Sequence, residues 1–146
     1  MSLDARGRGP VTIDAALTNV QFGPAFTDAS TFALYAKGDP TFTNFTGPMF
    51  AAGCHGAPRQ FSDDIGWSWL DAAGDTIVYN DNTVANPANL LLTTADLKTV
   101  DLGRDHLAPR LIATQANATF FVGHDKRSIV YTVDGDAPGL YVARAV

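Results

Sequence analysis

The stretch Phe121-Val-Gly-His-Asp-Lys-Arg-Ser-Ile-Val-Tyr131 is the last of three versions of one motif in this chain. The earlier versions read Phe26-Thr-Asp-Ala-Ser-Thr-Phe-Ala-Leu-Tyr35 and Trp69-Leu-Asp-Ala-Ala-Gly-Asp-Thr-Ile-Val-Tyr79. Each version begins with an aromatic residue, passes through a short polar turn, and ends in an apolar run closed by tyrosine. Such a repeat within 146 residues predicts a fold assembled from similar structural units.

Four short strands are predicted for each unit, from apolar alternation and turn residues. The first strand precedes the motif, at residues 19–22, 64–69 and 118–122. The second is the run that ends in tyrosine, at residues 32–36, 76–80 and 128–133. The third follows a polar loop, at residues 47–52, 89–94 and 139–144. The fourth starts with proline, which suits the beginning of an outermost strand, at residues 9–13, 57–61 and 108–112.

The spacing of those prolines sets the boundaries of the units. Pro10 and Pro58 are 48 residues apart, and Pro58 and Pro109 are 51 apart. The last unit ends after its third strand, while the chain begins with a fourth strand that has no unit before it. We therefore expect Pro10–Ile13 to lie beside residues 139–144. The predicted units are residues 15–62, residues 63–114, and residues 115–146 completed by residues 9–14.

Four antiparallel strands per unit resemble the blade of a β-propeller. The motif is similar to the repeats of TolB-like (PD40-type) propellers, in which the first strand runs into a Ser-Pro-Asp-Gly-type turn. The corresponding turns here are degenerate and lack the Pro-Asp pair: Thr27-Asp-Ala-Ser30, Asp71-Ala-Ala-Gly74 and Gly123-His-Asp-Lys126. The resemblance implies one all-β domain of three four-stranded antiparallel propeller-like blades, the last completed by the N-terminal strand. It also implies protein partners and a periplasmic or extracellular location.

Closed propellers have four to eight blades, so three blades would leave apolar sheet faces uncovered. Two copies of the chain would make a six-bladed ring, of which each copy is half. Alternatively, the other blades come from the missing half of a longer polypeptide, or from a second half-propeller chain. A third reading is a β-sandwich with accidental self-similarity.

The composition supports many turns and short strands. All fifteen acidic residues are Asp, Glu is absent, and Gly and Pro together number 21. Asp, Gly and Pro favour turns, whereas Glu is typical of helices. The net charge of −5 argues against a nucleic-acid partner, no apolar run is long enough to span a membrane, and the first nine residues lack the apolar core of a signal peptide.

Acidic residues recur in the loops predicted for one face of the blades, and we take them as candidate ligand-binding residues: Asp39, Asp63, Asp64, Asp81, Asp134 and Asp136. Oxygen-rich loops of this kind could hold Ca²⁺, although turn propensity alone also explains Asp at these positions. We predict no catalytic residue, no resident metal and no other cofactor.

Trp67 completes the set of candidate binding residues. With Trp69 it lies on one side of a predicted strand, and paired aromatic rings beside polar loops could bind a sugar. The alternative is that such aromatic side chains fill the gaps between blades. The sequence thus favours a non-catalytic binding module, then a carbohydrate-binding propeller assisted by Ca²⁺. A hydrolase is the third reading, and no Ser lies in a Gly-x-Ser-x-Gly motif.

Overall fold

The described part of the chain is all-β. The computed structural model describes residues 25–26, 32–36, 48–53, 57–63, 70–73, 75–85, 93–125, 127–134 and 136–144. Ten strands and no helix occur in these ranges, and every strand pair is antiparallel. The predicted all-β class is confirmed. The first strands predicted at residues 19–22 and 64–69 and the N-terminal strand at residues 9–13 lie outside the described residues.

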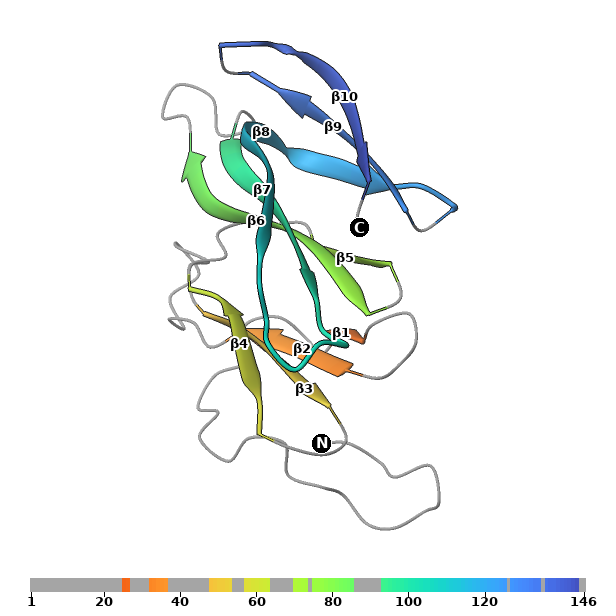
Figure 1. The fold of residues 1–146 in the computed structure, drawn as a ribbon. Coiled ribbons are helices and arrows are strands. Elements are labelled where there is room, and N and C mark those ends of the chain that lie inside the picture. The colour runs from red at the N-terminus through yellow and green to blue at the C-terminus, as the bar shows by residue number, and fades with distance from the viewer. Residues whose placement is uncertain are drawn as a thin grey trace.

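Four strands form the first layer of the molecule (Figure 1). They follow one another in sequence and in space: β1 (Ala25–Phe26), β2 (Phe32–Ala36), β3 (Met49–Gly53) and β4 (Arg59–Ser62). The proline-led segment at residues 57–61 forms the edge strand β4, as predicted, whereas the one at residues 108–112 begins an internal strand of the other sheet. Edge strands tolerate a preceding Pro58 because no neighbour needs its missing N–H.

The remaining six strands form one sheet in the order β10-β9-β8-β7-β6-β5. Their bounds are β5 (Leu70–Ala73), β6 (Thr76–Ala85), β7 (Thr93–Asp101), β8 (Arg110–Val122), β9 (Ser128–Val133) and β10 (Gly139–Arg144). The sheet bends sharply, so that β8, β9 and β10 lie over β6 and β7 in Figure 1. We call β5, β6 and β7 the middle layer, and the second half of β8 with β9 and β10 the third layer.

Strand β8 connects these two layers. Its first part pairs with β7 and its second part pairs with β9. The change of pairing partner from β7 to β9 occurs around Gln115, whose φ of 53° is left-handed. The register of β8 with β9 shifts between Ala116 and Phe120. A bulge of this kind increases twist and bends a strand. Two separate strands were predicted at residues 108–112 and 118–122, and this was wrong because one bent strand spans both.

The described strands therefore belong to two hydrogen-bonded sheets that stack as three layers. Neither sheet closes on itself among the described residues. The predicted grouping into three separate four-stranded sheets is not what the described strands form, since the second and third units share β8.

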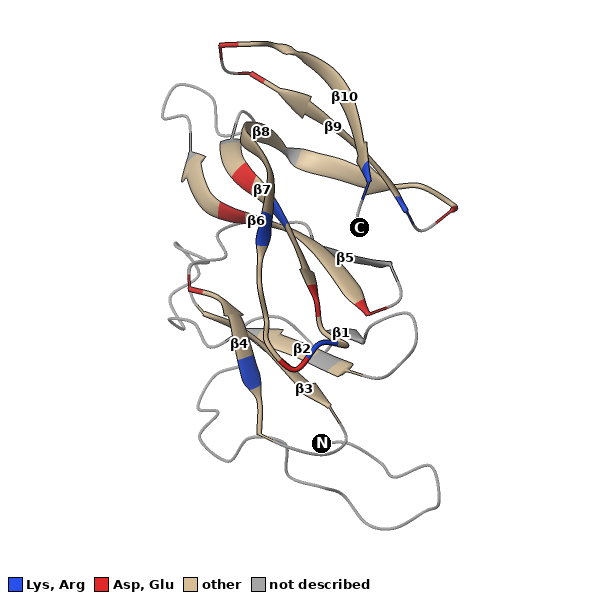
Figure 2. Ribbon diagram, viewed as in Figure 1, with Lys and Arg blue, Asp and Glu red and all other residues tan. Residues whose placement is uncertain are grey.

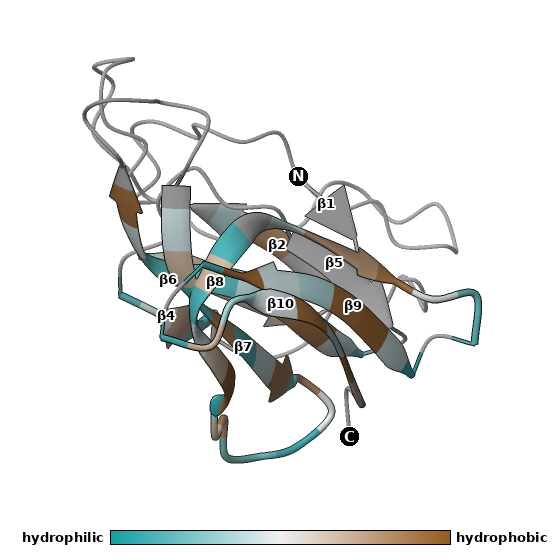
Figure 3. Ribbon diagram, turned by 90° about the horizontal axis from the view of Figure 1, so that it is seen from above, coloured by the Kyte–Doolittle hydropathy of each residue, from teal (hydrophilic) through white to brown (hydrophobic). Residues whose placement is uncertain are grey.

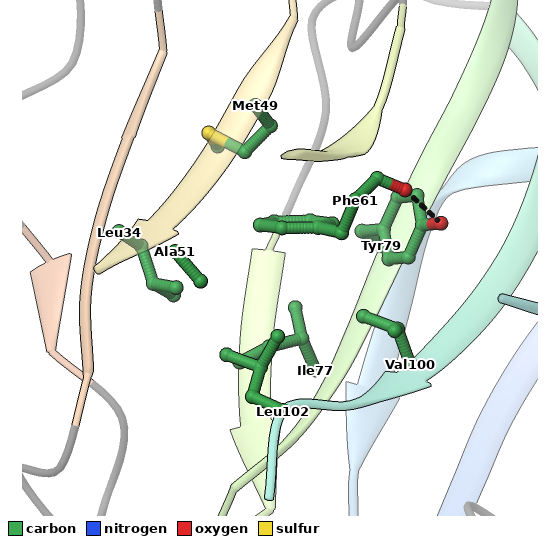
Figure 4. Close-up of a cluster of buried hydrophobic side chains, with 8 residues drawn as sticks. All are labelled: Leu34, Met49, Ala51, Phe61, Ile77, Tyr79, Val100 and Leu102. Carbon is green, nitrogen blue, oxygen red and sulfur yellow. Dashed lines mark hydrogen bonds between the residues drawn. The ribbon is translucent and has the colours of Figure 1, made fainter. Parts of the chain in front are cut away.

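Two hydrophobic cores separate the three layers. The core between the first and middle layers joins β2, β3 and β4 to β6 and β7 (Figure 4): Leu34, Met49, Ala51, Phe61, Ile77, Tyr79, Val100 and Leu102. The core between the middle and third layers comprises Val78, Leu97, Ala116, Phe120, Ile129 and Tyr131. Strand β6 is thus buried on both sides, and consecutive residues Ile77, Val78 and Tyr79 are each fully buried.

Arg59 fastens the first layer to the turn that follows β7. Its guanidinium donates hydrogen bonds to the carbonyl oxygens of Leu102 and Arg104. The same guanidinium lies 5.4 Å from the centre of the Phe32 ring. A planar cation can satisfy two carbonyls and stack on an aromatic face at once, which Lys could not do.

Candidate functional site

Three of the candidate binding residues, Asp39, Asp64 and Trp67, lie outside the described residues. Asp63 is exposed immediately after β4, where its Oδ1 accepts a hydrogen bond of 2.6 Å from Gln60 Nε2. The remaining described candidates are Asp81, Asp134 and Asp136, and they occupy two very different environments.

Asp81 was predicted in a loop, and this was wrong. The residue lies within β6 and is only 7% exposed. Strand β6 continues past it to Ala85 through a register shift, with Asn82 at a φ of 50°. Asn tolerates left-handed backbone geometry better than most residues, so the Asn-Asp-Asn sequence forms a bulge in a long strand instead of a loop.

Both carboxylate oxygens of Asp81 are occupied by groups from this chain. Ser62 Oγ in β4 donates to Oδ1 at 2.8 Å, and Lys98 Nζ in β7 lies 2.7 Å from Oδ2. The carboxylate therefore joins the first layer to the middle layer. A charged group that is nearly buried must be paired in this way to be tolerated. Asp81 contributes to the packing of the layers, and its oxygens are not open to a ligand.

Tyr79 lies two residues before Asp81, on the same side of β6. Its hydroxyl donates a hydrogen bond of 3.1 Å to the carbonyl oxygen of Phe61, and its ring packs edge-on against the Phe61 ring (Figure 4). Burial raises the pKa of Tyr79 above its ordinary value, and the negative charges of Asp81 and Asp63 raise it further. The phenol therefore remains a neutral hydrogen-bond donor between two layers.

Acidic residues from all three layers nevertheless lie along one side of the stack, which we call the acidic end. Asp96 in β7 is directly opposite Asp81 in β6, and its Oδ2 accepts a hydrogen bond of 2.9 Å from Asn82 Nδ2. In the third layer, the backbone N–H of Asp134 donates to the carbonyl oxygen of Gln115 at the bend of β8. Figure 2 shows acidic segments at the end of β4, on β6 and β7, and in the β9–β10 turn along one side of the ribbon.

Asp134 and Asp136 are exposed members of this acidic end. They flank the turn between β9 and β10, where the loop of the last unit was predicted. No described Lys, Arg or His side chain forms an ion pair with either carboxylate. Among the candidate binding residues that the structure describes, these two and Asp63 are exposed, whereas Asp81 is buried.

Apolar side chains lie exposed on the side of the third layer that faces away from the middle layer. In the strand register, Phe121 is opposite Val130, Val130 is opposite Val142, and Leu140 is opposite Thr132. Phe121, Leu140 and Val142 are 68%, 72% and 69% exposed. We call Phe121, Val130, Leu140 and Val142 the outer face. Figure 3 looks down on this layer and shows hydrophobic segments on β9 and β10.

The opposite side of the same strands is buried. Phe120, Tyr131 and Ile129 pack onto the middle layer, and Tyr141 stacks on Tyr131 with ring centres 5.7 Å apart. The rings of Phe120 and Tyr131 therefore fill the space between the middle and third layers. Phe121 differs from its neighbour Phe120 because alternation along β8 directs it to the outer face.

A shallow depression of about 330 Å³ lies where β8 begins and β10 ends. Its lining includes Arg110 and Arg144, and Arg110 Nη2 donates a hydrogen bond of 2.8 Å to the Arg144 carbonyl oxygen. Positive charge is thus placed at one corner of the third layer, at the end of β10 away from the acidic turn.

Within the described ranges, no group of three or more His, Cys, Asp or Glu side chains could hold a metal ion. The same ranges contain no helix long and apolar enough to cross a membrane. No family model, curated protein or solved structure matches the chain.

Sequence reasoning anticipated uncovered sheet faces but did not identify the residues of the outer face. The usable signal is the alternation of Gly139–Arg144, combined with the position of Val130 immediately before the motif tyrosine. Lys98 was also missed, because its partner Asp81 was assigned to a loop.

Proposed function

We propose that this chain is a non-catalytic protein-binding module of propeller-like layers, and that the outer face is its main binding surface. The observation that carries the proposal is the exposure of Phe121, Leu140 and Val142 together on one side of a sheet. Burying one such side chain fully contributes about 1.5–3 kcal/mol, so several together can drive association. Contiguous apolar surface of this kind on a water-soluble domain marks an interaction site.

The repeat itself supports this assignment. Leu34, Val78 and Val130 each stand immediately before the motif tyrosine. Leu34 packs toward the middle layer, and Val78 packs toward the third layer. Val130 is the equivalent position in the third layer and is directed away from the stack. By this equivalence the outer face is the side that a further layer would cover.

A partner could cover this face in more than one arrangement. Three propeller-like layers fit half of a six-bladed TolB-like ring, with either a second copy or a second half-propeller chain as the other half. Each arrangement needs the outer face to be buried against another polypeptide, and the proposed function requires only that.

Site-specific photo-crosslinking tests the proposal. A benzophenone amino acid at Val142 should give a discrete adduct with another polypeptide in an extract of the source cells. The same amino acid at Asp105, which is exposed in the turn after β7, is the matched control. Equal adducts at both positions, or none at Val142, would show that the outer face is not a binding surface.

The acidic end is a second candidate surface, favoured by the exposed carboxylates of Asp134 and Asp136. Negative charge on one side of a chain with a net charge of −5 would attract a basic peptide. The double variant Asp134→Asn with Asp136→Asn should then weaken the binding of an oligolysine peptide at low salt. Unchanged affinity would remove this surface from consideration.

The carbohydrate-binding alternative, with or without Ca²⁺, remains a separate proposal. It depends on Trp67, which lies outside the described residues. The aromatic side chains of Phe120 and Tyr131 are buried between layers. Binding to a glycan array, compared with and without Ca²⁺, tests it directly.

A further inference from the structure

We propose that the free edge of β10 binds residues 10–14 of the same chain as one more antiparallel strand, with Val11 opposite Val142. The inference concerns the edge of the third layer, and it does not depend on the outer face as a binding surface. It rests on the strand pairs that the equivalent proline-led segments form in the first two units.

The edge of β10 is open among the described strands. β10 pairs with β9 on one side, and none of the other described strands pairs with it. Every residue of β10 is exposed except Ala143, which is half-buried. An open edge presents unpaired N–H and C=O groups, so it can accept a further strand.

The third strand of each of the first two units has a proline-led neighbour. β3 pairs with β4, which begins after Pro58, and β7 pairs with the first part of β8, which begins after Pro109. Both pairs are antiparallel. In the repeat, β10 is the third strand of the last unit, and the segment that begins at Pro10 is the proline-led segment not yet paired with a third strand.

The two described units share one register. In each, the residue immediately before the motif tyrosine lies opposite a residue of the third strand: Leu34 opposite Ala51, and Val78 opposite Thr99. That residue of the third strand lies in turn opposite the residue that follows the proline: Ala51 opposite Arg59, and Thr99 opposite Arg110.

The same register can be transferred to the last unit. Val130 precedes the motif tyrosine and lies opposite Val142. The residue that follows the proline is Val11, so Val11 takes the place opposite Val142. The next pair along the strands is Thr12 opposite Tyr141.

A bulge at the same place in both units extends the comparison. The pairing skips the third residue after the proline, which is Phe61 in one unit and Ile112 in the other. Phe61 packs in the core between the first and middle layers, and Ile112 packs against the core between the middle and third layers. Each thus faces the next layer of the stack. Ile13 is the equivalent residue of the last unit, so its side chain should join the outer face.

The chain is long enough for this pairing. Ten residues, 15–24, separate the segment from β1 in the first layer. They reach roughly 33 Å when extended, whereas layers about 10 Å apart place the third layer roughly 20 Å from the first. A short tether also gives an effective concentration in the millimolar range, which favours the chain's own segment over that of a second copy.

Backbone NOEs in the unmodified chain test the pairing and its register. Cross-peaks should join residue 11 to residue 142 and residue 12 to residue 141, and the methyl groups of Ile13 should contact the outer face. Cross-peaks from the free edge of β10 to a different segment, or none across that edge, would overturn the inference.

Disulfide trapping separates this register from the neighbouring one. Val11→Cys with Val142→Cys, in a Cys54→Ala background, should close within one chain on mild oxidation, since directly opposite Cβ atoms lie about 4.5–5.5 Å apart. Val142 is mostly exposed, so the variant should fold. The matched control combines Val11→Cys with Ala143→Cys, because the next residue of β10 points to the opposite side of the sheet.

The Val142→Cys pair should close on the order of 10-fold faster than the control, because a disulfide requires Cβ atoms on the same side. Equal rates, or faster closure with Ala143→Cys, would overturn the register. A disulfide-linked dimer in place of a closed monomer would show that the strand comes from a second copy and would overturn pairing within one chain.

Discussion

Replacing Lys98 with methionine should reduce the free energy of unfolding by about 2–3 kcal/mol, which lies between the values for exposed and buried ion pairs. Lys98 Nζ lies 2.7 Å from Asp81 Oδ2, and the two side chains are 22% and 11% exposed. Methionine keeps the unbranched apolar stem of lysine but removes the charge. The Asp81 carboxylate would then remain between two layers with the hydroxyl of Ser62 as its hydrogen-bond donor.

The magnitude follows from the position of the pair. Exposed ion pairs contribute roughly 0–1 kcal/mol. Removing one partner of a fully buried pair costs about 3–5 kcal/mol, because the other charge is left without compensation. Asp81 is almost buried, while Lys98 reaches water over about a fifth of its surface. An intermediate loss is therefore expected.

The assay is urea unfolding, in which the free energy of unfolding should depend on urea concentration with the same slope in each variant. Arg104→Met is the matched control, because Arg104 Nε lies 3.0 Å from Asp101 Oδ2 in a pair that is 74% and 42% exposed. The control should change stability by less than about 0.5 kcal/mol. Adding Asp81→Asn to Lys98→Met should recover most of the loss, since a neutral amide tolerates burial better than a carboxylate.

The result that would refute this reasoning is equal behaviour of the two pairs. If Lys98→Met costs no more than Arg104→Met, the Asp81 carboxylate is not held in a water-poor contact between β4 and β7. The interpretation of Asp81 as a group that joins layers would then be wrong, and Asp81 would again be a candidate ligand-binding residue.

Three further predictions concern single groups. Burial raises the pKa of Tyr79, so the unfolded chain loses the phenol proton first and the free energy of unfolding should fall as the pH rises above about 10. In urea titrations, Tyr79→Phe should make this alkaline fall less steep. At neutral pH the same variant should lose roughly 0.5–1.5 kcal/mol of stability, because the hydrogen bond to Phe61 is absent. The hydroxyl and N–H of Ser128 lower the pKa of exposed Asp125 to about 2, so its charged form should persist until the pH falls through that value, and carboxyl NMR titration of Ser128→Ala should give a higher midpoint. Gln115 has a left-handed φ of 53°, which a β-branched residue adopts only with strain. In thermal unfolding, Gln115→Val should therefore lower stability by about 1–2 kcal/mol, whereas Gln115→Gly should not. Equal losses in the two variants would show that the backbone at the bend of β8 is not strained.

The strands that depend on local pattern were predicted well from the sequence. Residues 32–36, 128–133 and 139–144 coincide with β2, β9 and β10. In each case apolar or alternating residues are bounded by Gly, Asp, Ser or Thr, and turn residues of this kind end a strand for reasons within a few residues of it. Strand β4 also follows its proline, as an edge strand should.

The errors arose where distant residues decide the local structure. Residues 113–119 contain no Gly or Pro, so nothing local marks the point where β8 passes from one layer to the next. The bend depends on Gln115 and on the register of β7 and β9 on either side. The position of Asp81 also depends on distant residues. Ser62 and Lys98, 19 and 17 residues away, bind its carboxylate and allow it to be buried within a strand.

The candidate surface emerges from comparing the repeat with the burial. Leu34, Val78 and Val130 are equivalent in sequence, yet Leu34 and Val78 are buried to within 2% while Val130 is only partly buried. The residue type does not explain this difference, since Val78 and Val130 are the same amino acid. What differs is the presence of a following layer, which covers the side of β6 that carries Val78. An apolar position that the repeat prepares for burial, and that this chain alone leaves in contact with water, is therefore the place where a partner would complete the structure.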